Sequence, residues 1–229
     1  MLEGRKGKSY GVQTRISLQQ KIRLRLSPIV VVLMKEVFFF MFKNNSKENI
    51  FLSSAKELKK VQALSVCAMF AALSLILNQV ASITIGPYIK IGFSGIPNQL
   101  VDYLFGPVTG GLFAGILDII KYFMKPDGPF FFGFTFNAIL ASLIYGSFYY
   151  KKKLTLKRVL LAKFVVFLVV NVILSTLWLD MLYGKGFLAL LPMRALKNVI
   201  MWPIDSFIFF SITKVIEQTG VFRPLKRTA

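Results

Sequence analysis

The chain has 229 residues, 55% of them hydrophobic and 17% charged, with a mean hydropathy of +0.62 and a formal net charge of +19. A soluble domain of this length could not bury so much apolar surface, so the composition predicts an integral membrane protein whose basic segments face anionic lipid rather than nucleic acid. One cysteine, Cys67, and no histidine in the sequence exclude an internal disulfide, histidine-based catalysis and an HExxH zinc site.

Residues 1–55 are basic and polar, and their apolar run "SPIVVVLMKEVFFFMF" is too short to span a bilayer about 30 Å thick. One interpretation is a basic arm on the membrane surface. The other is that the natural start is Met41, because "KEVFFFM" can be encoded by a bacterial ribosome-binding site and a T-rich spacer. We expect residues 1–55 to be an extension, disordered or partly misannotated, 56–219 a membrane domain and 220–229 a basic cytoplasmic tail.

The segment "GRKGKS" near the start resembles the end of a phosphate-binding loop. No glycine stands five places before Gly7, however, and no apolar strand leads into the segment. The sequence therefore predicts no ATPase motif, and it predicts no catalytic residue, metal site or cofactor. Energy for any transport must come from a partner protein or a gradient.

Hydropathy breaks the rest of the chain into six predicted helices, at about 58–81, 96–105, 112–124, 134–150, 159–182 and 188–217. Between the first two, "SITIGPYIKIGFSG" alternates β-branched and polar residues and predicts a short hairpin. Six spans put both termini on one side of the membrane. Most lysines and arginines gather on that side, which the positive-inside rule assigns to the cytoplasm. The predicted fold is an all-α integral membrane protein with six transmembrane helices.

The last predicted helix contains charges inside an apolar run, "LLPMRALKNVIMWPIDSFIFF". Arg194, Lys197 and Asn198 fall on one helical stripe, and Asp205 returns to nearly the same face about 16 Å deeper. One interpretation is a polar ligand cavity near the outer surface, because ionised groups inside a bilayer usually face a cavity or one another. The alternative is snorkelling of the two cations to headgroups, together with structural pairing.

Small and aromatic residues form two further patterns. Ala68 and Ala72 in the first helix make a small-xxx-small pair, which lets another helix approach closely or serves ordinary internal packing. Aromatic side chains cluster near the outward ends of the helices, and Phe93, Trp178 and Tyr183 are among them. They form either an interfacial belt or stacking walls for a flat heteroaromatic ligand.

Taken in order, these motifs resemble the substrate-binding S components of energy-coupling factor (ECF) vitamin transporters. The shared stretches are "GPYIKIGFSGIPNQLVDYLFGPVTGGLFAGILDII" and "GPFFFGFTFNAILASLIYG". The stretch "NVILSTLWLDMLYGKGFLALLPMRALKNVIMWPID" is similar to the folate-specific members. The resemblance covers the chain from about Lys56 to the end of the last helix.

This resemblance implies a six-helix bundle that captures folate from outside with high affinity. Partners would be a membrane-embedded coupling protein (the T component), which docks on Ala68 and Ala72, and two cytoplasmic ATPases. The glutamate tail of folate would suit Arg194 and Lys197, the pterin would suit Asn198 or Asp205, and the flat ring would stack on Trp178. The location would be the plasma membrane of a Gram-positive bacterium.

Two other functions stay open at this stage. An S component for another vitamin, such as riboflavin or thiamine, would share the early motifs, although outward-facing cations favour a dianionic ligand over cationic thiamine. A membrane scaffold without a ligand would use the polar stripe only to pair helices. A membrane enzyme is not favoured, because the sequence offers no set of nucleophile and base.

Overall fold

The computed structural model describes residues 50–85, 89–126, 129–183 and 187–219. The predicted extension before Ile50, the predicted start at Met41 and the basic tail 220–229 lie outside these residues. The helices are α2 (Ile50–Glu57), α3 (Val61–Val80), α4 (Gly95–Met124), α5 (Phe132–Tyr149), α6 (Leu156–Val166), α7 (Ser175–Tyr183) and α8 (Phe187–Gln218). A π-helical segment, η1 (Phe167–Leu174), joins α6 to α7, and strands β1 (Ser82–Ile85) and β2 (Ile89–Gly92) form the predicted antiparallel hairpin.

Helix α4 consists of two antiparallel helices joined by one residue. Gly106, at φ 85° and ψ −173°, interrupts the helical backbone, and Pro107 begins the second half. A Cβ built on Gly110 would lie 3.3 Å from the Cα of Asp102. Residues eight apart on a straight helix are separated by about 12 Å, so the chain must reverse at Gly106. With α3, α5, the continuous α6–η1–α7 rod and α8, this gives the six predicted spans.

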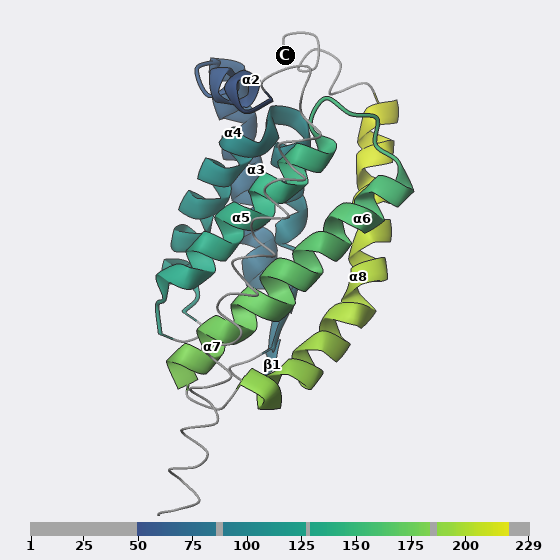
Figure 1. Ribbon diagram of the computed structural model, residues 1–229. Coiled ribbons are helices and arrows are strands. Elements are labelled where there is room, and N and C mark those ends of the chain that lie inside the picture. Colours follow the sequence, from purple (N-terminus) through teal and green to yellow (C-terminus); the bar gives the residue numbers. More distant parts are fainter. Residues whose placement is uncertain (1–49, 86–88, 127–128, 184–186, 220–229) are drawn as a thin grey trace, which may run out of the picture.

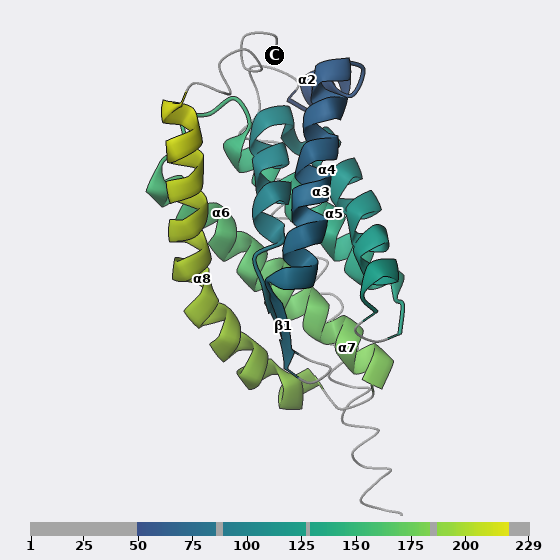
Figure 2. The same cartoon turned by 180° about the vertical axis from the view of Figure 1, so that it is seen from behind.

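The first and last described helices, α2 and the final turns of α8, lie at the same end of the bundle, as six crossings require (Figure 1). That end carries the cationic segment between α5 and α6 and the first turn of α6, where Lys151, Lys153 and Lys157 are exposed. The pKa of Lys152 is lowered by partial burial and by the nearby Arg158. The positive-inside rule assigns this end to the cytoplasm. The hairpin, α7 and the start of α8 then lie at the outer end (Figure 2).

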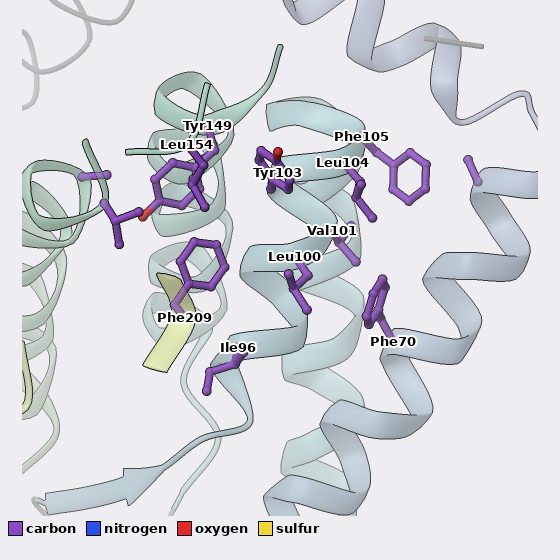
Figure 3. Packing of buried hydrophobic residues seen from close by; sticks show 13 residues of the cluster. Phe70, Ile96, Leu100, Val101, Tyr103, Leu104, Phe105, Tyr149, Leu154 and Phe209 are labelled. Atoms are coloured by element: carbon purple, nitrogen blue, oxygen red, sulfur yellow. The ribbon is translucent and has the colours of Figure 1, made fainter. Parts of the chain in front are cut away.

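The larger core cluster is formed by α3, the first half of α4, the end of α5, α6 and α8, and the second half of α4 adds the partly buried Phe113. Figure 3 shows Phe70 packing on one side of the first half of α4, with Tyr149 and Phe209 on its other side. The rings of Tyr149 and Phe209 stack with centroids 5.3 Å apart. Close approach of α4 and α5 depends on Gly146, because a Cβ there would lie 2.5 Å from the backbone of Pro107. These contacts hold the helices of the bundle together.

Helix α2 begins before the predicted domain boundary at Lys56. It packs against α4, and its Ile50 and Ser54 side chains are buried. Large apolar side chains on α3 and α8, including Met69, Ile76 and Phe207, are instead exposed. Exposure of apolar residues along helices of this length and hydropathy is typical of a surface that faces lipid.

Candidate functional site

The outer end of the bundle holds a hydrogen-bonded group centred on Trp178, which we call the Trp178 cluster: Phe131, Gly133, Asn137, Ser175 and Trp178. The indole Nε1 of Trp178 donates to Asn137 Oδ1 at 3.0 Å, and Asn137 Nδ2 donates to Ser175 Oγ at 2.9 Å. Asn137 and Ser175 are buried, whereas Trp178 is half-buried. The cluster therefore joins the start of α5 to α7 and leaves part of the indole accessible.

The π-helix η1 places two members of this cluster. The Ser175 N–H bonds to the carbonyl of Val170, five residues earlier, and Ser175 Oγ donates to the same carbonyl at 2.9 Å. A π-turn holds one more residue than an α-turn, so it rotates every following side chain about the helix axis. Ser175 and Trp178, three residues apart, consequently share the face of α7 that meets α5. π-helical turns are frequent at functional sites.

Next to the cluster, α4 and α5 are linked by a polar contact. Thr135 Oγ1 donates to Asp118 Oδ2 at 2.9 Å. Such a bond satisfies a carboxylate in an apolar helix from within the protein, as expected for a helix–helix contact in a membrane. The geometry gives Asp118 a structural role.

The hairpin is fixed to the outer ends of α3 and α4 by hydrogen bonds at both of its ends. Lys125 Nζ donates to Ser82 Oγ at 3.0 Å, and Lys121 Nζ donates to the carbonyl of Ser94 at 3.2 Å. Ser74 Oγ donates to that carbonyl as well, at 2.5 Å. Phe93, a predicted ligand residue, comes just before Ser94 and packs partly buried against the core. Its position is therefore set by the same anchor.

The predicted polar stripe lies on α8. Lys197 and Asn198 are half-buried, whereas Leu196, Val199 and Ile200 beside them are exposed. The two polar residues are thus less exposed than the apolar residues beside them. The side chains of Arg194 and Tyr183 lie outside the described part of the structure, so only their helices, α8 and α7, are placed.

Asp205, the deepest predicted site residue, lies where α8 crosses α6. Its carboxylate is within electrostatic reach of Lys163 and Lys197, and Lys163 Nζ donates to the Asp205 carbonyl at 2.6 Å. A second bond across the same crossing joins Trp202 Nε1 to the carbonyl of Leu160 at 3.0 Å. Both hydrogen bonds link α6 to α8 through backbone carbonyls and neither involves the Asp205 carboxylate, so the ligand and pairing interpretations of Asp205 both stay open.

The predicted coupling surface lies on α3, away from the Trp178 cluster. Ala68 and Ala72 are both exposed, along with Leu64, Met69 and Leu73 on the same side, while Ala63 is buried in the core. A row of small residues on an exposed membrane helix permits close approach of another helix. The two alanines therefore face out of the bundle.

The described residues contain no group of three or more histidine, cysteine or carboxylate side chains that could hold a metal ion. Sequence reasoning did not single out Asn137 and Ser175 as site residues. Both are polar residues inside apolar runs, "FTFNAIL" and "VILSTLW". The sequence does not show which residue either of them contacts, so neither could be assigned to a site. The outer end offers an accessible indole, half-buried polar groups on α8 and an anchored hairpin.

Comparison with known proteins places these features in a family. A family model described as "ECF transporter, substrate-specific component" matches residues 62–213. The folate transporter FolT of Clostridium novyi is 32% identical over 170 residues, which is 74% of this chain and 98% of that protein. FolT of Leuconostoc mesenteroides is 36% identical over 145 residues, covering 60% of this chain and 77% of the relative.

A solved structure of FolT bound with folic acid has a similar fold. It superposes with a TM-score of 0.61 at 33% sequence identity, covering 66% of this chain and 90% of that one. The region that the family model matches runs from α3 into α8, so it includes the helices that carry the Trp178 cluster and the polar stripe.

Proposed function

Because the chain belongs to the family of ECF transporter substrate-specific components, we propose that it is the folate-binding subunit of such a transporter. The proposal rests on the alignment with a folate transporter, which covers 98% of that protein's length. The similarity to a solved structure of FolT bound with folic acid supports it. The role is capture of folate at the outer surface and its delivery inward. No catalytic step is assigned to the chain itself.

We propose that folate lies between α7 and α8 at the outer end. Its pterin ring stacks on Trp178, with Phe93 and Tyr183 as further aromatic contacts. Its glutamate carboxylates meet the guanidinium of Arg194 and the ammonium of Lys197, and Asn198 supplies an amide. Support comes from the half-buried positions of Trp178, Lys197 and Asn198 at one end of the bundle.

Asp205 is the weakest member of this proposed set. A carboxylate at that depth could accept hydrogen bonds from the pterin, yet it also lies near the cations of Lys163 and Lys197, which offer it a structural role instead. A ligand role for Asp205 requires that folate reach the crossing of α6 and α8. The order of the charges along α8 supports a tail-outward, pterin-inward orientation.

Transport is proposed to depend on partners. The exposed Ala68 and Ala72 on α3 offer the close-packing surface that a coupling protein, the T component, would use. Two cytoplasmic ATPases would supply the energy, in agreement with the missing phosphate-binding motif. We place the protein in the plasma membrane of a Gram-positive bacterium, with α2 and the end of α8 on the cytoplasmic side, supported by relatives from Clostridium and Leuconostoc.

Uptake of radiolabelled folate tests this function. Cells that lack folate uptake should accumulate the label when they express this chain together with an ECF coupling protein and its ATPases, and not when they express the coupling proteins alone. Excess unlabelled folate should abolish accumulation, whereas excess riboflavin should not. Accumulation that riboflavin blocks and folate does not would reassign the substrate.

A further inference from the structure

Asn137 occupies an unusual position, because every described hydrogen bond of its side chain serves the Trp178 cluster. The side chain is 6% exposed. Its Oδ1 accepts from Trp178 Nε1 at 3.0 Å and its Nδ2 donates to Ser175 Oγ at 2.9 Å. An indole N–H can only donate, so the amide oxygen must face Trp178 and the amide nitrogen must face Ser175.

The chain of bonds continues to the π-helix. Ser175 Oγ accepts from Asn137 and donates to the carbonyl of Val170 at 2.9 Å. The indole N–H, the amide N–H of Asn137 and the hydroxyl of Ser175 therefore each have an acceptor, and the last acceptor is a backbone carbonyl. A satisfied buried network of this kind holds its members in one arrangement, because any other arrangement leaves a buried polar group without a partner.

Steric contacts restrict the indole further. Its ring lies 5.6 Å from the ring of Phe131, centroid to centroid, at an interplanar angle of 53°. Gly133 leaves room for the indole, since a Cβ at that position would lie 2.8 Å from Trp178 Cδ2. The hydrogen bond to Asn137 fixes rotation of the indole, and these contacts fix its tilt.

We infer that Asn137 is a positioning residue for ligand binding: it orients Trp178 so that the indole offers its π-face, and not its N–H, to a flat heteroaromatic ligand. The inference rests on the proposed function, in which that ligand is the pterin of folate. Because the only polar group of the indole is used by Asn137, Trp178 contributes stacking to recognition and no hydrogen bond. Hydrogen bonds to the polar groups of the ligand must then come from other residues.

The test uses two substitutions at Asn137 in a Trp202→Phe background, in which Trp178 is the only tryptophan of the sequence. Asn137→Leu removes the amide at similar volume, whereas Asn137→Gln keeps both an acceptor for Nε1 and a donor for Ser175 Oγ. Thr213→Val serves as a matched control. Thr213 is fully buried and donates to the carbonyl of Phe209 within α8, so its loss measures the removal of a buried hydroxyl away from the site.

Emission from Trp178 and folate affinity by calorimetry are the two readouts. Asn137→Leu should shift the emission maximum and weaken folate binding about tenfold or more, the loss expected for one buried hydrogen bond and a displaced stacking partner. Asn137→Gln, which keeps the amide, should restore most of both readouts, and Thr213→Val should change neither. Restoration separates positioning of the indole from a general loss of stability.

Two kinds of result would overturn the inference. One leaves the proposed function intact, and the other contradicts it as well. If the Trp202→Phe parent binds folate and Asn137→Leu binds it equally well, or if Asn137→Gln is as impaired as Asn137→Leu, Asn137 does not position the stacking ring while the proposed function stands. If the folded parent does not bind folate at all, the proposed function fails and the inference fails with it.

Discussion

Thr109 donates two hydrogen bonds to Ser54, which lies 55 positions earlier in the sequence. Ser54 Oγ accepts from the backbone N–H of Thr109 at 3.1 Å, and Thr109 Oγ1 donates to the carbonyl of Ser54 at 2.7 Å. Ser54 Oγ also accepts from the N–H of Val108 at 3.0 Å and donates to the carbonyl of Phe105 at 2.6 Å. One buried hydroxyl of α2 therefore satisfies the ends of both helices that meet at Gly106.

Removal of this hydroxyl should destabilise the protein. Ser54→Ala leaves two helix N–H groups and one carbonyl without their partner in a buried site, which predicts a loss of about 1–3 kcal/mol in the free energy of unfolding. Thermal unfolding in detergent, followed by circular dichroism, measures the effect. The control is Ser65→Ala, because Ser65 is exposed and bonds only within α3. Equal melting temperatures for the two variants would refute the capping role.

The turn at Gly106 should not tolerate a side chain. Gly106 has φ 85°, which an L-residue adopts with strain, and a Cβ there would lie 2.9 Å from Ser54 and from Tyr150. Gly106→Ala should therefore lower the melting temperature, at a cost of at least about 1 kcal/mol. Gly95→Ala is the control, since its Cβ would meet nothing closer than 4.0 Å. A Gly106→Ala protein as stable as Gly95→Ala would show that the turn is less constrained than its geometry indicates.

Arg194 tests the proposed orientation of folate. If its guanidinium binds the glutamate tail, Arg194→Ala should weaken folate binding about tenfold or more and leave the binding of a tail-less pterin nearly unchanged. Arg194→Lys should keep part of the affinity, because it retains the charge without the bidentate geometry. Calorimetric titration of both ligands measures the difference. Equal losses for folate and pterin would exclude the tail assignment.

The face of α3 that carries Ala68 and Ala72 should matter for transport and not for binding. Ala68→Leu with Ala72→Leu blocks close helix approach at an exposed surface, so folate uptake with the coupling proteins should fall severely while folate affinity stays within about twofold. Val215→Phe enlarges an exposed apolar residue on α8 instead and should leave uptake unchanged. Unimpaired uptake in the double variant would remove this face from the proposed interface.

The helical architecture was predictable from the sequence, because apolar runs separated by polar segments indicate membrane-spanning helices. The hairpin at 82–92 was likewise predictable, because β-branched and polar residues alternate in "SITIGPYIKIGFSG". The third predicted helix began too late, at residue 112, since the observed helix starts at Pro107. The "GPVTGG" run suggests a longer turn when read alone, and the cap that permits a one-residue reversal comes from distant Ser54.

The site was predictable only in part. Trp178, Lys197 and Asn198 stood out as polar or aromatic residues in apolar helices, and the structure gives them half-buried positions on α7 and α8. The π-helix could not be found, because an apolar run such as "FLVVNVIL" suits an α-helix equally well. Asn137 was missed for a related reason. Its role depends on residues 38 and 41 positions away in sequence, which no local pattern records.

The most direct test of the central claim is a titration of the purified protein with folate, followed by the fluorescence of its two tryptophans, Trp178 and Trp202. We predict saturable quenching with one folate per protein, because the pterin stacks on Trp178, and little response to riboflavin at the same concentrations. Tight quenching by riboflavin, or no response to folate from the folded protein, would contradict a folate-binding subunit.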